Sequence, residues 1–201
     1  MNPILQDLVA FVAILNPFAL CLYLVGLIHD LNRRDFFWVM TAATAMSLAA
    51  FVVFAFGGDP LLRGLGIRVS AMRMFGGLIL LGIAYNYVMK GYKAAEMLRG
   101  SLDELPSAIA MPFMIGAGTI TQAIMMGRSH PPVVTAGILV VAMGFSLGVV
   151  CLFYVLHGFF HAKRERVFNR YINILARLNG LLIGAIAMEM TLQGAHKLWA
   201  S

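Results

Sequence analysis

The chain has 201 residues, of which 61% are hydrophobic and only 12% are charged. A soluble domain carries about 25% charged residues, so this composition excludes a soluble protein and predicts one that is embedded in a lipid bilayer. The net charge of +6 at pH 7 does not indicate a nucleic-acid partner, because the basic residues lie in short loops between apolar runs, where they meet lipid headgroups.

Six apolar runs of roughly spanning length follow one another, so we predict an all-α membrane protein with six transmembrane helices in a single domain, residues 1–201. In chain order, the predicted spans are 8–28, 36–56, 74–89, 105–126, 133–156 and 175–196. The second span is expected to end at the turn Gly57-Gly58-Asp59-Pro60. The first run lacks the basic segment that precedes a cleaved signal, so we expect it to be a retained helix.

The basic residues of the loops predict how the chain is oriented. One side of the membrane receives Arg63, Arg68, Arg73, Arg128 and Lys197, and the remaining ten of the 15 Lys and Arg residues fall on the opposite side. Because cytoplasmic loops carry the excess of positive charge, the sequence predicts a multi-pass protein of the plasma (inner) membrane with both termini outside.

Two of the predicted spans are interrupted in the same way. Asn16-Pro17 breaks the first, and Pro112 followed by Gly116-Ala117-Gly118 breaks the fourth. Proline removes a helical hydrogen bond, and lipid cannot satisfy the backbone groups that a broken helix exposes, so these groups must line protein or a wet cavity.

Such paired breaks are typical of substrate sites in secondary transporters. Helix N-termini near them favour a carboxylate, and the open alternative is a pair of ordinary kinked helices without a ligand. The predicted substrate-binding residues are Asn16, Pro17, Pro112, Gly116, Gly118, Thr119 and Thr121.

The third and sixth spans resemble each other. Gly77 to Gly91 aligns with Gly180 to Gly194 without a gap at an offset of 103, and Pro17 and Pro112 are 95 residues apart. This pattern predicts two repeats, about 1–100 and 101–201, although similar Leu-rich and Gly-rich segments also match by chance. Three spans per repeat make the second repeat inverted, an arrangement that permits alternating access.

Two polar residues occupy equivalent positions in these aligned spans, namely Asn86 and Glu189. A carboxylate within a span is costly and is by default functional, so we predict that Glu189 contributes to ion coupling or to binding of a substrate amine. The alternative is that Glu189 lies near the outer interface and is solvated.

The motifs Leu15-Asn16-Pro17, Arg73 to Leu81, Pro112 to Thr121 and Ile186-Ala187 to Gly194 together resemble the MarC family, also described as the SnatA-type neutral amino acid transporter family. The resemblance covers nearly the whole chain. It implies a six-span inner-membrane protein that moves small neutral amino acids such as glycine and alanine. This sequence has Ala117 between the two glycines, where the family has proline, and Glu189, where the family usually has glutamine.

Other classes of function find little support in the sequence. Cys21 and Cys151 have no metal-ligand spacing, no catalytic constellation or nucleotide-binding glycine loop is present, and we expect no enzyme activity, cofactor or metal. We therefore expect a secondary transporter of neutral amino acids, with export as a plausible direction. The sequence leaves open whether transport is coupled to protons or to sodium, and it does not indicate the oligomeric state. A channel-like pore and a non-transporting membrane scaffold are the alternatives.

Overall fold

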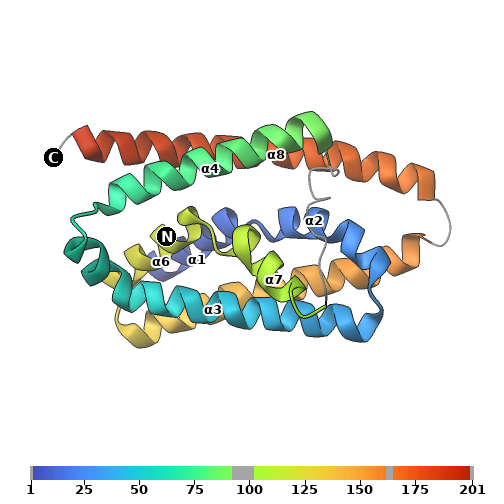
Figure 1. The fold of residues 1–201 in the computed structure, drawn as a ribbon, viewed down its shortest axis with the longest axis horizontal. Coiled ribbons are helices and arrows are strands. Elements are labelled where there is room, and N and C mark those ends of the chain that lie inside the picture. Colours follow the sequence, from blue (N-terminus) through green and yellow to red (C-terminus); the bar gives the residue numbers. More distant parts are fainter. Residues whose placement is uncertain (1, 92–101, 162–164, 200–201) are drawn as a thin grey trace.

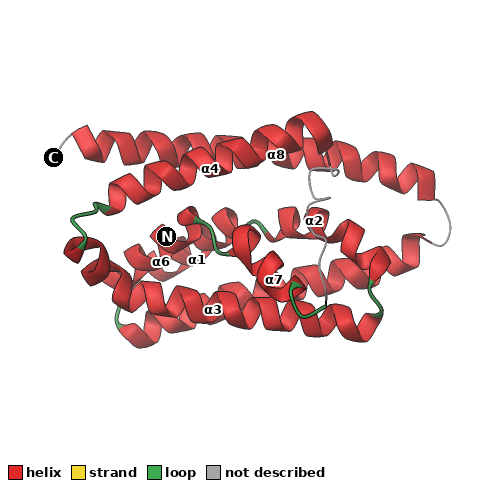
Figure 2. Cartoon of the chain, viewed as in Figure 1, coloured by secondary structure: helices red, strands yellow, loops and turns green. Residues whose placement is uncertain are grey.

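The computed structural model describes residues 2–91, 102–161 and 165–199, and all regular secondary structure within these ranges is helical (Figures 1 and 2). The elements are α1 (Pro3–Leu15), α2 (Pro17–Asp30), α3 (Arg33–Gly64), α4 (Val69–Lys90), α5 (Leu105–Ile109), the π-helical turn η2 (Ala110–Met114), α6 (Ala117–Ser129), α7 (Pro132–His161) and α8 (Glu165–Trp199). Of the basic residues used to predict orientation, Lys93, Arg99, Lys163 and Arg164 lie outside the described residues.

Five stretches are long and apolar enough to cross a membrane, which confirms an all-helical, multi-pass membrane protein. They are Pro3–Leu22, Arg33–Gly64, Val69–Lys90, Pro132–Leu156 and Asn173–Trp199, and they match the first, second, third, fifth and sixth predicted spans. The region of the fourth predicted span, 105–126, is divided among α5, η2 and α6. None of these three elements has the roughly 20 residues that a helix needs to cross a bilayer alone.

The predicted end of the second span is wrong, because α3 continues through Gly57-Gly58-Asp59-Pro60 to Gly64. Asp59 forms an ion pair with Arg63 one turn later at 2.8 Å, and it also pairs with Arg128 on α6. These contacts hold the last turns of the helix in place despite the hydrogen bond that Pro60 removes. The helix ends where Gly66 takes a positive φ of 67° and the Ile67 N–H donates to the Leu62 carbonyl at 2.8 Å.

The helices form two layers, with α4 and α8 side by side along one edge and the remaining helices beneath them (Figure 1). Glycines allow the close approach of α4 and α8. A Cβ atom on Gly77 would lie 2.7 Å from the Ala187 carbonyl oxygen, and one on Gly180 would lie 2.8 Å from the Tyr87 Cβ. Small residues serve this purpose widely between membrane helices, because lipid offers no hydrophobic force that drives helices together.

The lower layer is packed around a continuous apolar core. Phe11 of α1 meets Phe51 of α3 edge-on at 5.1 Å, and Phe36 of α3 stacks on Tyr154 of α7 at 4.2 Å between ring centroids. Phe11, Phe36 and Phe51 are fully buried. These aromatic contacts fix α1, α3 and α7 relative to one another, and thereby the position of the first break.

We predict that Gly77→Ala lowers the unfolding temperature of the detergent-purified protein, because the added methyl group overpacks the α4–α8 contact at a typical cost of about 1–3 kcal/mol. Gly82→Ala, on the same helix, is the matched control, since a Cβ atom there meets nothing within 4 Å. Thermal unfolding followed by a thiol-independent fluorescent probe measures both variants. An unchanged unfolding temperature for Gly77→Ala would contradict the tight α4–α8 contact.

Candidate functional site

The first break lies at Asn16, which ends α1 and begins α2. Its backbone is left-handed, with φ 47° and ψ 72°, and it is the one non-glycine residue with a positive φ among the described residues. Asparagine tolerates this region better than most residues. The Asn16 N–H donates to the Val12 carbonyl at 2.8 Å, and the Asn16 Oδ1 accepts the Ala19 N–H at 3.0 Å. Pro17 follows as the first residue of α2, where no amide donor is needed.

The Asn16 side chain also reaches across to α8, where its Nδ2 donates to the Oδ1 of Asn179 at 3.0 Å. Because the Oδ1 of Asn16 is held by the Ala19 amide, the orientation of both carboxamides is fixed. Asn179 is only 3% exposed, and within the described part of the chain its Nδ2 has no hydrogen-bond partner. A buried donor without a partner costs about 1–3 kcal/mol, so this atom is well placed to bind an acceptor.

The second break extends from η2 to the start of α6. Inside η2, next to Pro112, Met111 leaves the helical region with φ −115° and ψ 122°. Ile115 (φ −89°, ψ 86°) and Gly116 (φ −110°, ψ 163°) are also non-helical. The first break therefore occurs at Asn16, as the sequence indicates, and the second extends from Met111 to Gly116, around the predicted Pro112 and Gly116.

Two buried threonines stabilise the second break. The Thr119 Oγ1 accepts the Gly116 N–H at 2.9 Å and lies 2.9 Å from the carbonyl oxygen of Met114, to which it donates. The Thr121 Oγ1 donates to the Ala117 carbonyl at 2.7 Å. The Thr119 hydroxyl thus bonds to the interrupted backbone itself, and the Thr121 hydroxyl bonds to the first turn of α6.

Gly118 brings the two breaks together. A Cβ atom on Gly118 would lie 3.0 Å from Cε of Met190 on α8, 3.2 Å from Cγ2 of Ile14 on α1 and 3.3 Å from Cδ1 of Leu80 on α4. Ile14 is two residues before Asn16, so the end of α1 and the start of α6 adjoin. The three neighbouring side chains are apolar, and they close this junction tightly.

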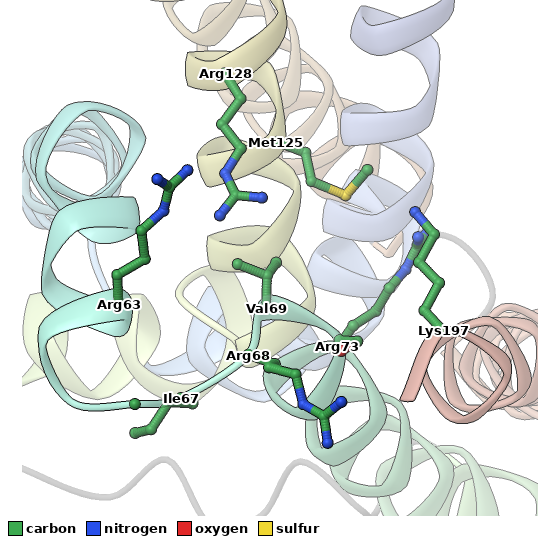
Figure 3. Close-up of a pocket in the computed structure, with 10 residues that line it drawn as sticks. Arg63, Ile67, Arg68, Val69, Arg73, Met125, Arg128 and Lys197 are labelled. Atoms are coloured by element: carbon green, nitrogen blue, oxygen red, sulfur yellow. The ribbon is translucent and has the colours of Figure 1, made fainter. Parts of the chain in front are cut away.

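A cavity of about 690 Å³ lies toward the opposite end of α6 (Figure 3). Its wall carries basic side chains from the ends of α3, α4, α6 and α8, and we call it the cationic cavity: Arg63, Arg68, Arg73, Arg128 and Lys197. The sequence places these same residues on one side of the membrane, but it does not indicate that they share a cavity.

Sequence reasoning missed a polar cluster between α1 and α6. The Asp7 Oδ2 lies 2.7 Å from His130 Nε2, and Gln122 Nε2 donates to the Asp7 Oδ1 at 3.4 Å. Most of the surface of the Asp7 and His130 side chains is buried. The sequence signal that could have indicated this cluster is Asp7 itself, since a carboxylate in an apolar helix requires a partner.

Asn86 of α4 is half-buried, and Glu189 of α8 is exposed. Asn86 Nδ2 donates to the Gly82 carbonyl at 3.0 Å, and Gln193 Nε2 donates to a Glu189 carboxylate oxygen, so each side chain bonds within its own helix. Glu189 is also within electrostatic range of Arg73. A role in ion coupling stays a prediction for both residues.

Known proteins resemble the chain along its whole length. The family model described as MarC family integral membrane protein matches residues 1–199. A UPF0056 membrane protein of Aquifex aeolicus is 26% identical over 200 residues, which cover 94% of this chain and 90% of that protein. The UPF0056 inner membrane protein YhgN of Escherichia coli is 25% identical over 201 residues, which cover 99% of this chain and 98% of that protein. No solved structure matches.

We predict that Asn16→Ala destabilises the protein more than Asn16→Gly does. Both variants lose the cap of α2, which is worth about 1 kcal/mol, but alanine must also adopt the left-handed conformation at a further cost of about 1–2 kcal/mol. Thermal unfolding of the purified variants measures the difference. Equal unfolding temperatures for the two variants would show that the left-handed turn at residue 16 is not required.

Proposed function

Because the chain belongs to the MarC family of integral membrane proteins, we propose that it is a secondary transporter that moves small neutral amino acids, such as glycine and alanine, across the inner membrane by alternating access. Its apolar helices make it an integral, multi-pass membrane protein. One relative is named as an inner membrane protein, which supports the same location for this chain.

The observation that carries the proposal is the first break with its buried, unpartnered donor. The Asn16 side chain caps α2 and orients Asn179, whose Nδ2 then has no acceptor within the described residues. Hydrogen bonds to a charged group are worth about 1.5–3 kcal/mol. A substrate carboxylate is an acceptor of this kind, and binding it would satisfy an atom that otherwise destabilises the protein.

The helix ends around the breaks also suit a zwitterion. The last carbonyl groups of α1 give its end a partial negative charge, whereas the first amides of α2 and α6 give their starts a partial positive charge. A neutral amino acid carries an ammonium group and a carboxylate on the same α-carbon. The two ends of one broken helix, together with the start of α6, are complementary to these two charges.

An inverted repeat is supported by contacts that recur between α4 and α8 at the offset of 103 residues. Gly91 packs against Asn173, and the equivalent Gly194 packs against Ser70, which is the equivalent of Asn173. In the same way, Gly77 packs against Thr191, and its equivalent Gly180 packs against Val88. A two-fold relation between the halves would exchange each of these contacts with its counterpart.

The packing of the other helices follows the same exchange. The half-helix α6 packs against α4, and α2 packs against α8; α3 packs against α5 and α6, and α7 packs against α1 and α2. Equivalent movements of the two halves could then open a site between them to either side of the membrane. The tight contact of Gly118 with Ile14, Leu80 and Met190 fits a state in which the junction is closed.

We predict that reconstituted vesicles catalyse counterflow of labelled glycine or alanine, and that Asn179→Leu slows this flux by roughly 10- to 100-fold, as expected for the loss of a hydrogen bond to a charged group. Ser146→Ala is the control, because it removes a buried hydroxyl that bonds only to the Ala142 carbonyl of its own helix at 2.9 Å. Uptake with and without imposed proton and sodium gradients identifies the coupling ion.

Each alternative gives a different result in this assay. A flux that does not saturate with solute and shows no counterflow would indicate a channel. The absence of flux for a panel of neutral amino acids, with folded protein in the vesicles, would contradict the proposed substrate class. Equal flux through Asn179→Leu and wild type would remove Asn179 from the site.

The proposed orientation has its own test in a chain that carries Cys21→Ala and Cys151→Ala. We expect a membrane-impermeant maleimide to label Ser129→Cys on intact spheroplasts, because Ser129 is exposed at the end that the charge distribution places outside. Arg34→Cys, exposed at the other end, should react only after permeabilisation. The reverse pattern would place both termini in the cytoplasm.

A further inference from the structure

The cationic cavity is not lined by the residues of the two breaks, and we propose that it binds a phosphate group, carried either by an anionic phospholipid or by free inorganic phosphate. The ligand would be held by Arg73, Arg128 and Lys197 together with the first backbone amides of α4. This inference is independent of the transported substrate, since it concerns a different part of the molecule.

Positive charge exceeds negative charge at this site. Asp59 faces both Arg63 and Arg128, so one carboxylate serves two guanidinium groups. Arg73 is half-buried, and within the described part of the chain it makes no ion pair or hydrogen bond, with Glu189 acting on it only at longer range. A partly buried cation without a partner is unfavourable, and an anion in the cavity would relieve this cost.

The backbone supplies a second, independent indication. Val69 and Ser70 are the first two residues of the 22-residue helix α4, and both line the cavity. The side chain of the N-cap residue, Arg68, makes no capping hydrogen bond to this helix. The amides of Val69 and Ser70, which have no carbonyl partner within the helix, and the positive end of the helix dipole therefore adjoin the cavity, which is the arrangement in which helix N-termini bind phosphate.

The directions of approach favour phosphate over a carboxylate. Arg73, Arg128 and Lys197 belong to three different helices and reach the cavity from different sides (Figure 3). The free oxygens of a phosphate project from a tetrahedral centre and can accept from donors that lie in different planes, and guanidinium groups bind them through paired hydrogen bonds, whereas both oxygens of a carboxylate lie in one plane. Ile67 and Met125 add apolar surface to the wall, which suits the glycerol and first methylene groups of a phospholipid.

The test is a thermal unfolding titration of the full chain in detergent at constant ionic strength. The added compounds are phosphatidylglycerol, phosphatidylcholine, inorganic phosphate and sodium acetate. We expect phosphatidylglycerol, inorganic phosphate or both to raise the unfolding temperature of the wild type, while phosphatidylcholine and acetate leave it unchanged. Phosphatidylcholine is the zwitterionic control, because its choline neutralises the charge of its phosphate. Whichever of the two anionic phosphate compounds stabilises the protein identifies the source of the group.

Arg73→Gln should lower the affinity for the stabilising ligand by about tenfold, since it removes a hydrogen bond from a charged group. Lys197→Gln, at an exposed position, provides a second variant with the same expected direction. Arg34→Gln removes the same charge at the other end of the molecule and should bind like wild type. The proposal would be overturned if the three variants, Arg73→Gln, Lys197→Gln and Arg34→Gln, showed the same stabilisation by the ligand. It would also be overturned if acetate stabilised the protein to the same extent, or if neither anionic phosphate compound raised its unfolding temperature.

Discussion

A helix that stops inside a membrane must find partners for its exposed backbone groups within the protein, and the site is organised by the way this chain provides them. Asn16 uses the two polar atoms of one carboxamide for different purposes. Its Oδ1 caps α2, and its Nδ2 joins the break to Asn179 on α8. At the second break, the hydroxyl of Thr119 bonds to the backbone on both sides of the interruption. The breaks are consequently defined structures with fixed geometry.

The long pair α4 and α8 supports both breaks, but in two different ways. Gly76 of α4 and Asn179 of α8 are equivalent at the offset of 103 residues. Gly76 has no side chain, and this lets the start of α6 approach, since a Cβ atom there would lie 2.8 Å from the Gly118 amide nitrogen. Asn179 instead reaches the first break with a hydrogen bond. The polar contact belongs to the first break alone, so discrimination of a polar ligand is expected to concentrate there.

The features that could be predicted from the sequence are those that depend on local chemistry. Asn-Pro at 16–17, Pro112 and Gly116 indicate interrupted helices in apolar runs, and the breaks lie at or beside these residues, whereas Gly118 is already helical, in the first turn of α6. The partners of these residues could not be predicted. Asn16 and Asn179 are 163 residues apart and Asp7 and His130 are 123 apart, so their contacts depend on how the helices pack.

The end of α3 illustrates the reverse case, in which packing overrides a local signal. Gly57-Gly58-Asp59-Pro60 is a sequence that ordinarily ends a helix. Here Asp59 pairs with Arg63 and with Arg128 of α6, and a Cβ atom on Gly58 would lie 2.7 Å from the Ile124 side chain. These contacts with α6 exist only in the folded protein, and they extend the helix by about two turns.

The cationic cavity and the second break both adjoin α4, so binding at the cavity could affect the break through this helix only under a specific condition. Arg73 and Gly76 are three residues apart and therefore lie on one face of α4, with Arg73 at the cavity and Gly76 against the start of α6. An anion at Arg73 can influence the break only if it binds the open and closed states of the junction with different affinity. Because the start of α4 lines the cavity and its next turn contacts α6, a shift of α4 during opening would change both contacts together.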